Sequence, residues 1–135
     1  MNLFKFKTSN WVTDLALLLI RIGFGGMMIP AHGYKKLKNF EALKGEFYSF
    51  MGLSSSLSLS LAIFAELFCS ILLILGFMTR LATIPLIITM LVAMNMLGWE
   101  IVGKNELPFL FFMAYIVIFL AGPGKYSVDY LIRKK

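Results

Sequence analysis

The chain has 135 residues, of which 59% are hydrophobic and 15% are charged, and its formal net charge is +6. Its mean hydropathy is +0.83, and a soluble domain of this length could not bury so much apolar surface. The composition therefore predicts an all-α protein that crosses a membrane several times. Most basic residues flank the apolar runs, where they contact anionic lipid, so we expect the lipid bilayer as a partner and no nucleic acid.

Four apolar runs approach the length of about 20 helical residues that a hydrocarbon core requires. They cover residues 12–32, 57–77, 81–99 and 107–122, and the last needs extension through residue 105 or a locally thinner bilayer. Six of the seven Trp and Tyr residues fall at the ends of these runs, where rings prefer the headgroup level. We predict one domain over residues 1–135, folded as a bundle of four transmembrane helices.

The first run follows Lys5 and Lys7, as in a signal peptide, but it is too long for one and contains Arg21. We interpret it as the first helix. Helical spacing places a stripe of residues on one face, which should turn inward: Asp14, Arg21, Gly25, Met28 and His32.

The longest connection, residues 38–56, carries apolar residues at helical spacing beside charged ones: Phe40, Leu43, Phe47, Phe50 and Met51. This pattern predicts a short interfacial helix between the first and second spans. Ser56 is the predicted N-cap of the second span. That span and the third are joined by only Gly76 to Arg80, which predicts an antiparallel helical hairpin. Gly122-Pro123-Gly124 should end the fourth helix.

Glu66 lies near the middle of the second run, at the same depth as Arg21 if the first two helices are adjacent. A charge at bilayer depth costs roughly 2.5–3.5 kcal/mol and is usually paired, so we predict an ion pair between Arg21 and Glu66. A ridge of Ala62, Glu66 and Ser70 suits close approach to a hollow at Gly23, Gly25 and Gly26. Such a pair either fixes helix register without chemistry or belongs to a polar cavity.

A second cluster is expected at the outer ends of the helices, where His32, Glu100 and Glu106 reach one level. A histidine beside a carboxylate can shuttle protons, bind a quinone carbonyl or ligate a metal. Interfacial solvation is the alternative for His32, and Glu106 could also cap the fourth helix.

Several site chemistries are excluded by the residue inventory. With one histidine and Cys69 as the only cysteine, the chain offers no thiolate cluster, no internal disulfide and no metal motif. It also has no Gly-rich phosphate loop and no GxSxG elbow. We therefore predict no metal and no conventional hydrolase or kinase site.

Short motifs in a fixed order resemble the DoxX family of small bacterial membrane proteins from about residue 14 to 132. These motifs are Arg21-x-x-x-Gly25, His32-Gly33-x-x-Lys36-Leu37, Ala65-Glu66-Leu67, Leu75-Gly76-x-x-Thr79-Arg80-x-Ala82, Glu106, and Gly122-Pro123-Gly124-Lys125-Tyr126-Ser127-x-Asp129. Lys125 stands where the family usually has Arg, which keeps the charge but loses a bidentate fork. The family is similar to the small, DoxD-type subunit of an archaeal thiosulfate:quinone oxidoreductase.

The resemblance implies a membrane subunit of a quinone-linked or thiol-redox oxidoreductase system, with a redox partner that is soluble or membrane-bound. Arg21, His32, Glu66 and Glu106 would line its polar pocket, and a non-covalently held quinone is the compatible cofactor. Whether the chain itself is an enzyme stays open. The alternatives are a non-enzymatic scaffold or assembly factor for a soluble partner, and a small-solute or proton carrier, for which a homo-oligomer would be needed.

Orientation follows from seven basic residues on one side against five on the other. The larger group contains Lys5, Lys7, Arg80, Lys125, Arg133, Lys134 and Lys135. The positive-inside rule then predicts a multi-pass protein of the bacterial inner membrane with both termini in the cytoplasm.

Overall fold

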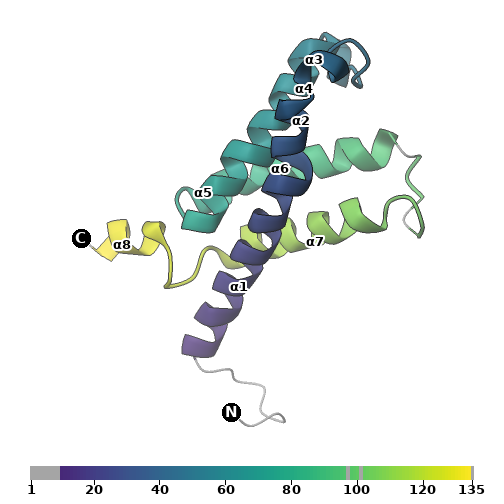
Figure 1. The fold of residues 1–135 in the computed structure, drawn as a ribbon. Helices are drawn as coiled ribbons and strands as arrows, with labels where there is room; N and C mark the ends of the chain where they lie inside the picture. Colours follow the sequence, from purple (N-terminus) through teal and green to yellow (C-terminus); the bar gives the residue numbers. More distant parts are fainter. Residues whose placement is uncertain (1–9, 97, 101, 135) are drawn as a thin grey trace.

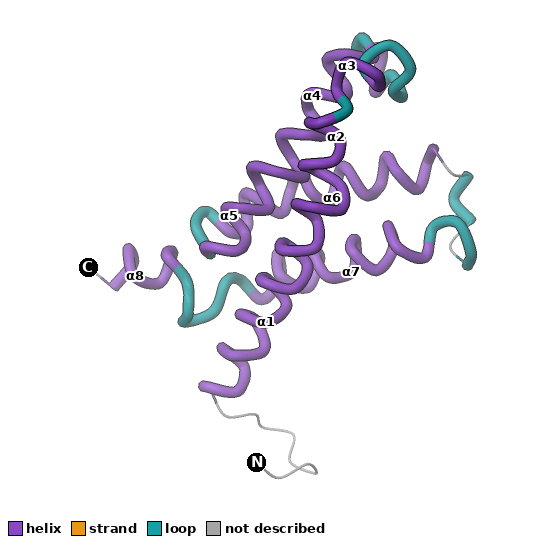
Figure 2. Tube along the Cα trace, viewed as in Figure 1, coloured by secondary structure: helices purple, strands orange, loops and turns teal. Residues whose placement is uncertain are grey.

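The computed structural model describes residues 10–96, 98–100 and 102–134, and these residues form helices and loops without a strand (Figure 2). The predicted all-α class is therefore confirmed for the described part of the chain. The orientation prediction depends partly on Lys5, Lys7 and Lys135, which lie outside the described residues. The α-helices are α1 (Asn10–Met28), α2 (Tyr34–Lys38), α3 (Phe40–Leu43), α4 (Ser55–Ile63), α5 (Ser70–Leu75), α6 (Thr79–Met96), α7 (Glu106–Ala121) and α8 (Val128–Lys134).

Three continuous helices in the described residues are long and apolar enough to cross a membrane: Asn10–Lys38, Ser55–Leu75 and Thr79–Met96. The first joins α1 to α2 through the π-helical segment η1 (Ile29–Gly33), and the second joins α4 to α5 through a second π-helical segment, η3 (Phe64–Cys69). The apolar helix α7 has 16 residues and is about 24 Å long, short of a hydrocarbon core of about 30 Å. The chain is thus a multi-pass membrane protein.

The long helices are arranged as two pairs that cross each other (Figure 1). The helix α1 packs against α5, and α6 packs against α7. The pair α6–α7 crosses behind α1, while α8 extends away at the C-terminal end. The core lies where the pairs meet, and its buried members are Met28, Cys69, Leu73, Ala82, Leu86, Met90, Phe111, Tyr115 and Ile118.

The first helix continues six residues beyond its predicted end at residue 32, to Lys38. Pro30 lies inside it, where it lacks the backbone N–H that an α-helix would use. The chain accommodates this residue in the π-turn η1 and then resumes α-helical structure in α2. Lys36, which lies beyond the predicted end of the first helix, is therefore a helical residue.

The predicted short helix between the first two spans is present only as the four residues of α3, followed by turns and a 3-10 segment, η2 (Phe50–Gly52). The predicted N-cap of the second span was wrong by two residues. Ser54, in extended conformation, accepts a hydrogen bond from the backbone N–H of Leu57 at 3.1 Å, so α4 begins at Ser55.

The third long helix ends at Met96 rather than at residue 99. Gly98 and Trp99 both have positive φ angles, 83° and 65°, so they cannot continue a right-handed helix. The Trp99 indole donates to the side chain of Asn95 at 3.0 Å, which holds this turn against the helix end. The fourth helix ends at Ala121, before Gly122, as predicted.

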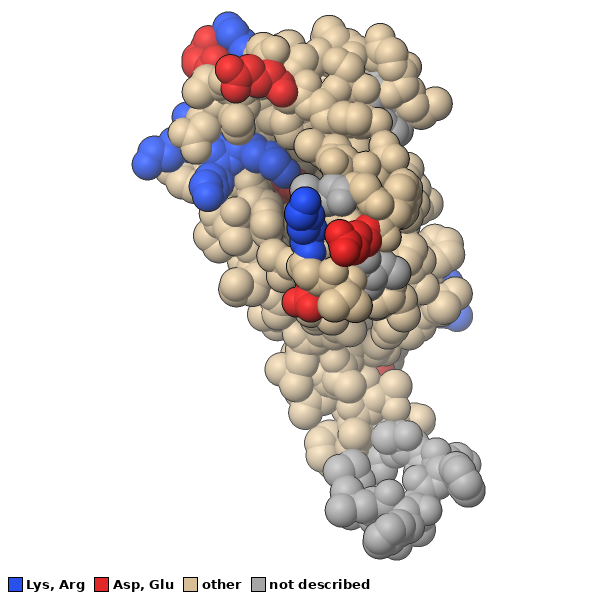
Figure 3. Space-filling view, turned by 90° about the vertical axis from the view of Figure 1, so that its right-hand side faces the viewer, with Lys and Arg blue, Asp and Glu red and all other residues tan. Residues whose placement is uncertain are grey.

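Charged side chains occupy limited areas of the face in Figure 3, and the basic ones group near the end of the molecule where α2 and α3 lie. Much of the remaining face is uncharged. Exposed residues on the long helices include Leu19, Ile22, Phe64, Phe68, Ile84 and Ile88. In a membrane protein, exposed apolar side chains of this kind face lipid.

Candidate functional site

Arg21 is fully buried, but the predicted ion pair between Arg21 and Glu66 was wrong. Its Nη1 donates to the carbonyls of Leu73 and Ile74, each at 3.1 Å, and its Nη2 donates to the carbonyl of Tyr126. The first two acceptors lie in the last turn of α5, where a helix carries partial negative charge. Carbonyl dipoles, together with the charge of Asp129, therefore compensate the guanidinium, and each such hydrogen bond contributes about 1.5–3 kcal/mol. The buried Nε of Arg21 has no hydrogen-bond partner among the described residues.

The segment that holds Tyr126, residues 122–130, is fastened to several helices. Its Asp129 carboxylate accepts the backbone N–H groups of Met78 and Thr79 at 2.8 and 3.0 Å, which caps the start of α6. Asp14 in α1 accepts the N–H of Lys125 at 3.0 Å. Arg21 and this C-terminal segment consequently hold α1, α5 and α6 together at one end of the molecule.

Glu66 pairs with Lys36 instead. The Lys36 Nζ lies 2.6 Å from both Oε1 and Oε2 of Glu66, so the contact is bidentate on the carboxylate. The Glu66 side chain is 2% exposed and that of Lys36 is 26% exposed. The ammonium group also lies 6.0 Å from the centroid of the Phe47 ring. A buried anion is thus joined to a cation that remains within reach of the surface.

The pair forms because two π-helical segments touch through their backbones. A Cβ at Gly33 in η1 would lie 2.9 Å from the backbone of Glu66 in η3, so only glycine allows this approach. The predicted hollow for the second span was correct at Gly25, where a Cβ would meet Ser70 and Ile74, and wrong at Gly23 and Gly26, which have open space. Single π-turns within α-helices often occur at functional sites.

A cavity of about 490 Å³ lies beside this ion pair. Among the described residues, Lys36 and Glu66 are the only charged ones in its lining; the others are Phe47, Tyr48, Ser58, Leu61, Ala62, Phe64, Ala65, Pro85, Ile88, Thr89, Val92, Ala93 and Met96. The lining residues Leu61, Phe64 and Ile88 are exposed, so the cavity opens between apolar side chains on the surface of the molecule. Its volume and its few polar groups are typical of a small-molecule site.

The other predicted site residues, His32 and Glu106, are not among the residues that line this cavity. His32 is half-buried, packs edge-on against Phe111 at 6.0 Å and interacts electrostatically with Glu66. Glu106 is exposed at the start of α7, where its Oε1 accepts the N–H of Gly103 at 3.3 Å. No hydrogen bond or ion pair joins His32 to Glu106 within the described residues.

Tyr115 is a polar group near the site that carried no functional interpretation in the sequence. It is fully buried, its hydroxyl has no hydrogen-bond partner among the described residues, and it interacts electrostatically with Glu66. No three His, Cys, Asp or Glu side chains of the described chain come together as a metal site would require. The arrangement therefore offers hydrogen-bonding groups beside an apolar cavity.

Sequence reasoning missed Lys36 because the first helix was ended at His32. Lys36 follows His32 by four residues, so it continues the stripe that begins at Asp14. Extending the predicted helix by one turn would have placed the Lys36 cation on the face that carries this stripe. The helical spacing of Lys36 was visible in the sequence. However, Pro30 and Gly33 disfavour a continuous α-helix and made its extension to Lys36 hard to predict.

Comparison with known proteins gives one family. No curated protein and no solved structure matches the chain. The model of the DoxX family matches residues 16–99, which contain Arg21, the Lys36–Glu66 pair and the whole cavity lining. Because this match covers more than half of the sequence, the chain belongs to the DoxX family.

Proposed function

We propose that this DoxX protein is the membrane subunit of a quinone-linked or thiol-redox oxidoreductase system and that it holds a quinone in the cavity beside Lys36 and Glu66. The observation that carries the proposal is one ion pair in the wall of an otherwise apolar cavity of about 490 Å³. A quinone combines a polar head with an apolar tail, and this wall offers complementary surfaces to both. The opening lies between the exposed side chains of Leu61, Phe64 and Ile88 and faces the lipid bilayer, in which quinones dissolve.

The polar groups of the cavity suit a carbonyl ligand. Lys36 has three N–H donors, two of which suffice for the Glu66 oxygens at 2.6 Å, so one remains for a ligand carbonyl. The Glu66 carboxylate accepts hydrogen bonds. A bound quinone would supply the electron-carrying chemistry, and Lys36 would orient its head.

His32 extends this arrangement towards the outer end of the first long helix. It interacts with both Glu66 and Lys36, and an imidazole ring can both donate and accept a proton. We infer that His32 moves protons between Glu66 and the outer boundary. Glu106 lies beyond His32 in this proposal, and Arg21 supports the fold.

Thiol chemistry would have to come from a partner. Cys69 is the only cysteine and is 2% exposed in the hydrophobic core. A buried cysteine behaves as a small hydrophobic residue. A soluble or membrane-bound redox partner would therefore carry any reacting thiol.

We also propose that α7 is the fourth crossing and that both termini lie in the cytoplasm of a bacterial cell, with the protein in the inner membrane. The helix α7 has no charged residue after Glu106, and it packs along α6, which is long enough to span. Fusions of a periplasm-dependent phosphatase and of a fluorescent protein to the C-terminus test the orientation. Fluorescence without phosphatase activity is expected, and the reverse result would contradict the proposed orientation.

Quinone binding is tested on protein purified in mild detergent from native membranes. Extracted lipids are analysed for quinones, and an azido-quinone is photocrosslinked to the protein. Lys36→Met and the cavity-filling Ala62→Phe should each reduce labelling at least fivefold. Lys35→Met is the matched control, because Lys35 is the exposed neighbour of Lys36 and does not line the cavity.

The proposal would be refuted if no quinone co-purified with the protein and if Lys36→Met and Ala62→Phe left the labelling unchanged. Recovery of one dominant soluble partner by crosslinking in native membranes would then favour the scaffold alternative. Proton or solute flux in proteoliposomes that Glu66→Gln abolishes would favour the carrier.

A further inference from the structure

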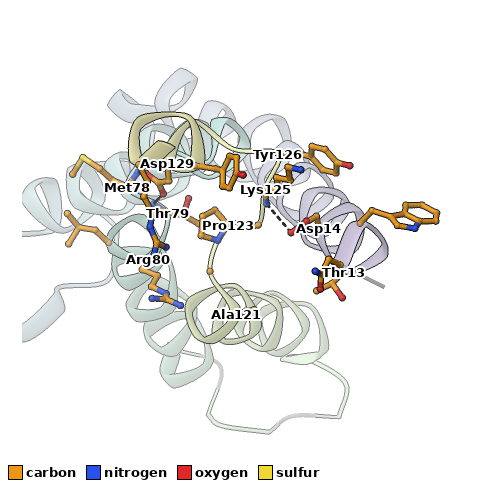
Figure 4. Close-up of a pocket in the computed structure, with 17 residues that line it drawn as sticks. Thr13, Asp14, Met78, Thr79, Arg80, Ala121, Pro123, Lys125, Tyr126 and Asp129 are labelled. Atoms are coloured by element: carbon orange, nitrogen blue, oxygen red, sulfur yellow. Dashed lines mark hydrogen bonds between the residues drawn. The ribbon is translucent and has the colours of Figure 1, made fainter. Parts of the chain in front are cut away.

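A second cavity, of about 1100 Å³, lies at the opposite end of the long helices from α2. It is enclosed by the start of α1, the start of α6, the end of α7 and the C-terminal segment 122–130 (Figure 4). In Figure 4, Pro123 lies between Asp14 and Lys125 on one side and Thr79 with Asp129 on the other. This cavity is separate from the one beside Lys36, since the two share no lining residue.

The acidic groups of this second cavity are already occupied. Asp14 accepts the backbone N–H of Lys125, and Asp129 accepts the backbone N–H groups of Met78 and Thr79. Both carboxylates therefore serve the fold. Within the described residues, neither carboxylate forms an ion pair with the basic side chains of this wall.

Three basic side chains line the same cavity: Arg80, Lys125 and Arg133. Arg80 donates from Nε to the carbonyl of Phe119 at 3.0 Å and from Nη2 to that of Leu120 at 3.3 Å, so its guanidinium is held in place at the end of α7. Its Nη1 donates to no described residue. Lys125 and Arg133 form no ion pair within the described part of the chain.

One buried polar atom in this wall also lacks a partner. Thr79 is 1% exposed, and its Oγ1 makes no hydrogen bond to any described residue. A buried hydroxyl left in this way costs about 1–3 kcal/mol. A ligand that accepts hydrogen bonds from Thr79 and from the basic side chains would remove that cost.

The aromatic residues of the wall indicate the level in the bilayer at which the cavity lies. Trp11, Tyr126 and Tyr130 line it and are exposed, and such rings prefer the headgroup level of a bilayer. Cations at this level attract anionic lipid. The ligand chemistry that fits a fixed guanidinium, two further cations and an unpaired hydroxyl is a phosphate oxyanion.

We propose that this cavity binds the phosphate group of an anionic phospholipid, with Arg80, Lys125 and Arg133 as cationic donors and Thr79 as a hydroxyl donor. A lipid is favoured over free phosphate because Trp11, Tyr126 and Tyr130 provide apolar surface for the glycerol and the start of the acyl chains. The site is thus a defined lipid site and not a diffuse attraction to charged headgroups. It is independent of the quinone proposal.

The test is a titration of the detergent-purified full chain with phosphatidylglycerol, phosphatidylcholine and inorganic phosphate, followed by native mass spectrometry and by thermal unfolding. We expect a single phosphatidylglycerol adduct that raises the unfolding temperature. Lys125→Gln and Arg133→Gln should each weaken binding about fivefold, and together about 25-fold, because each cation near the surface contributes about equally. The Lys125 side chain can be changed safely, since only its backbone N–H bonds to Asp14.

Lys38→Gln is the control, because this exposed lysine ends α2 at the other end of the molecule and should leave the adduct unchanged. Equal binding of phosphatidylcholine and phosphatidylglycerol would overturn the proposal. So would an adduct that survives the Lys125→Gln/Arg133→Gln double variant. Stabilisation by inorganic phosphate without any lipid adduct would overturn the lipid assignment and give the site to soluble phosphate.

Discussion

A double-mutant cycle on Lys36 and Glu66 tests the central contact of the candidate site. Removing the cation with Lys36→Met leaves a carboxylate that is 2% exposed without its partner, and breaking a buried pair in this way costs about 3–5 kcal/mol. We expect about 3 kcal/mol, the lower end of this range, because the Lys36 side chain is 26% exposed and water reaches it. Glu66→Gln should cost less, about 1 kcal/mol, because the freed ammonium can reach solvent.

The double variant Lys36→Met/Glu66→Gln should lose only about 2 kcal/mol, because no unpaired charge remains. The coupling free energy is then about 2 kcal/mol, within the range for residues in direct contact. Unfolding in mixed micelles of a mild detergent and dodecyl sulfate, followed by tryptophan fluorescence, gives each free energy. The method requires that unfolding be reversible and two-state.

A second cycle on Arg21 and Glu66 provides the matched control. These residues share no hydrogen bond or ion pair, so their effects should add to within about 0.5 kcal/mol. The structural reasoning would be refuted if the Arg21 cycle showed the coupling and the Lys36 cycle showed none. That result would restore the pairing predicted from the sequence.

Three further outcomes are expected. Gly33→Ala should lower the unfolding temperature and reduce quinone labelling, because its Cβ would lie 2.9 Å from the Glu66 backbone, whereas Gly23→Ala, with open space, should leave both unchanged. Arg21→Met should expose the C-terminal segment to limited proteolysis, because its link to that segment is lost, and Arg21→Lys should restore protection only partly. Cys69, at 2% exposed, should react with a maleimide only after unfolding, and rapid labelling of the folded protein would contradict the placement of η3.

The all-helical fold and the end of the fourth helix could be predicted because they depend on local signals. Apolar runs define the helices, and Gly122-Pro123-Gly124 ends the fourth helix where expected. The end of the third helix was misplaced because Gly98 and Trp99 adopt positive φ angles within a sequence that is still apolar. Hydropathy records burial in lipid and carries no information about backbone handedness.

The partners of the two intramembrane charges, Arg21 and Glu66, depend on how the helices pack, and the spacing of residues along the sequence does not determine this packing. Opposite charges at similar depth suggested a direct contact between Arg21 and Glu66. The structure instead pairs the Nη1 and Nη2 atoms of Arg21 with backbone carbonyls, which every residue possesses and no sequence pattern marks. The two π-turns also change the register of the helices, so regular helical spacing does not predict the face on which Glu66 lies.

The dependence of Arg21 on Tyr126 has a consequence for biosynthesis. These two residues are separated by 105 positions in the chain, so the ribosome makes the first helix long before its last acceptor exists. Until residue 126 has been synthesised, the Arg21 guanidinium therefore has only the carbonyls of Leu73 and Ile74 as hydrogen-bond acceptors. Final closure of the molecule can occur only after the polypeptide's tail has emerged, which makes late assembly an intrinsic property of this architecture.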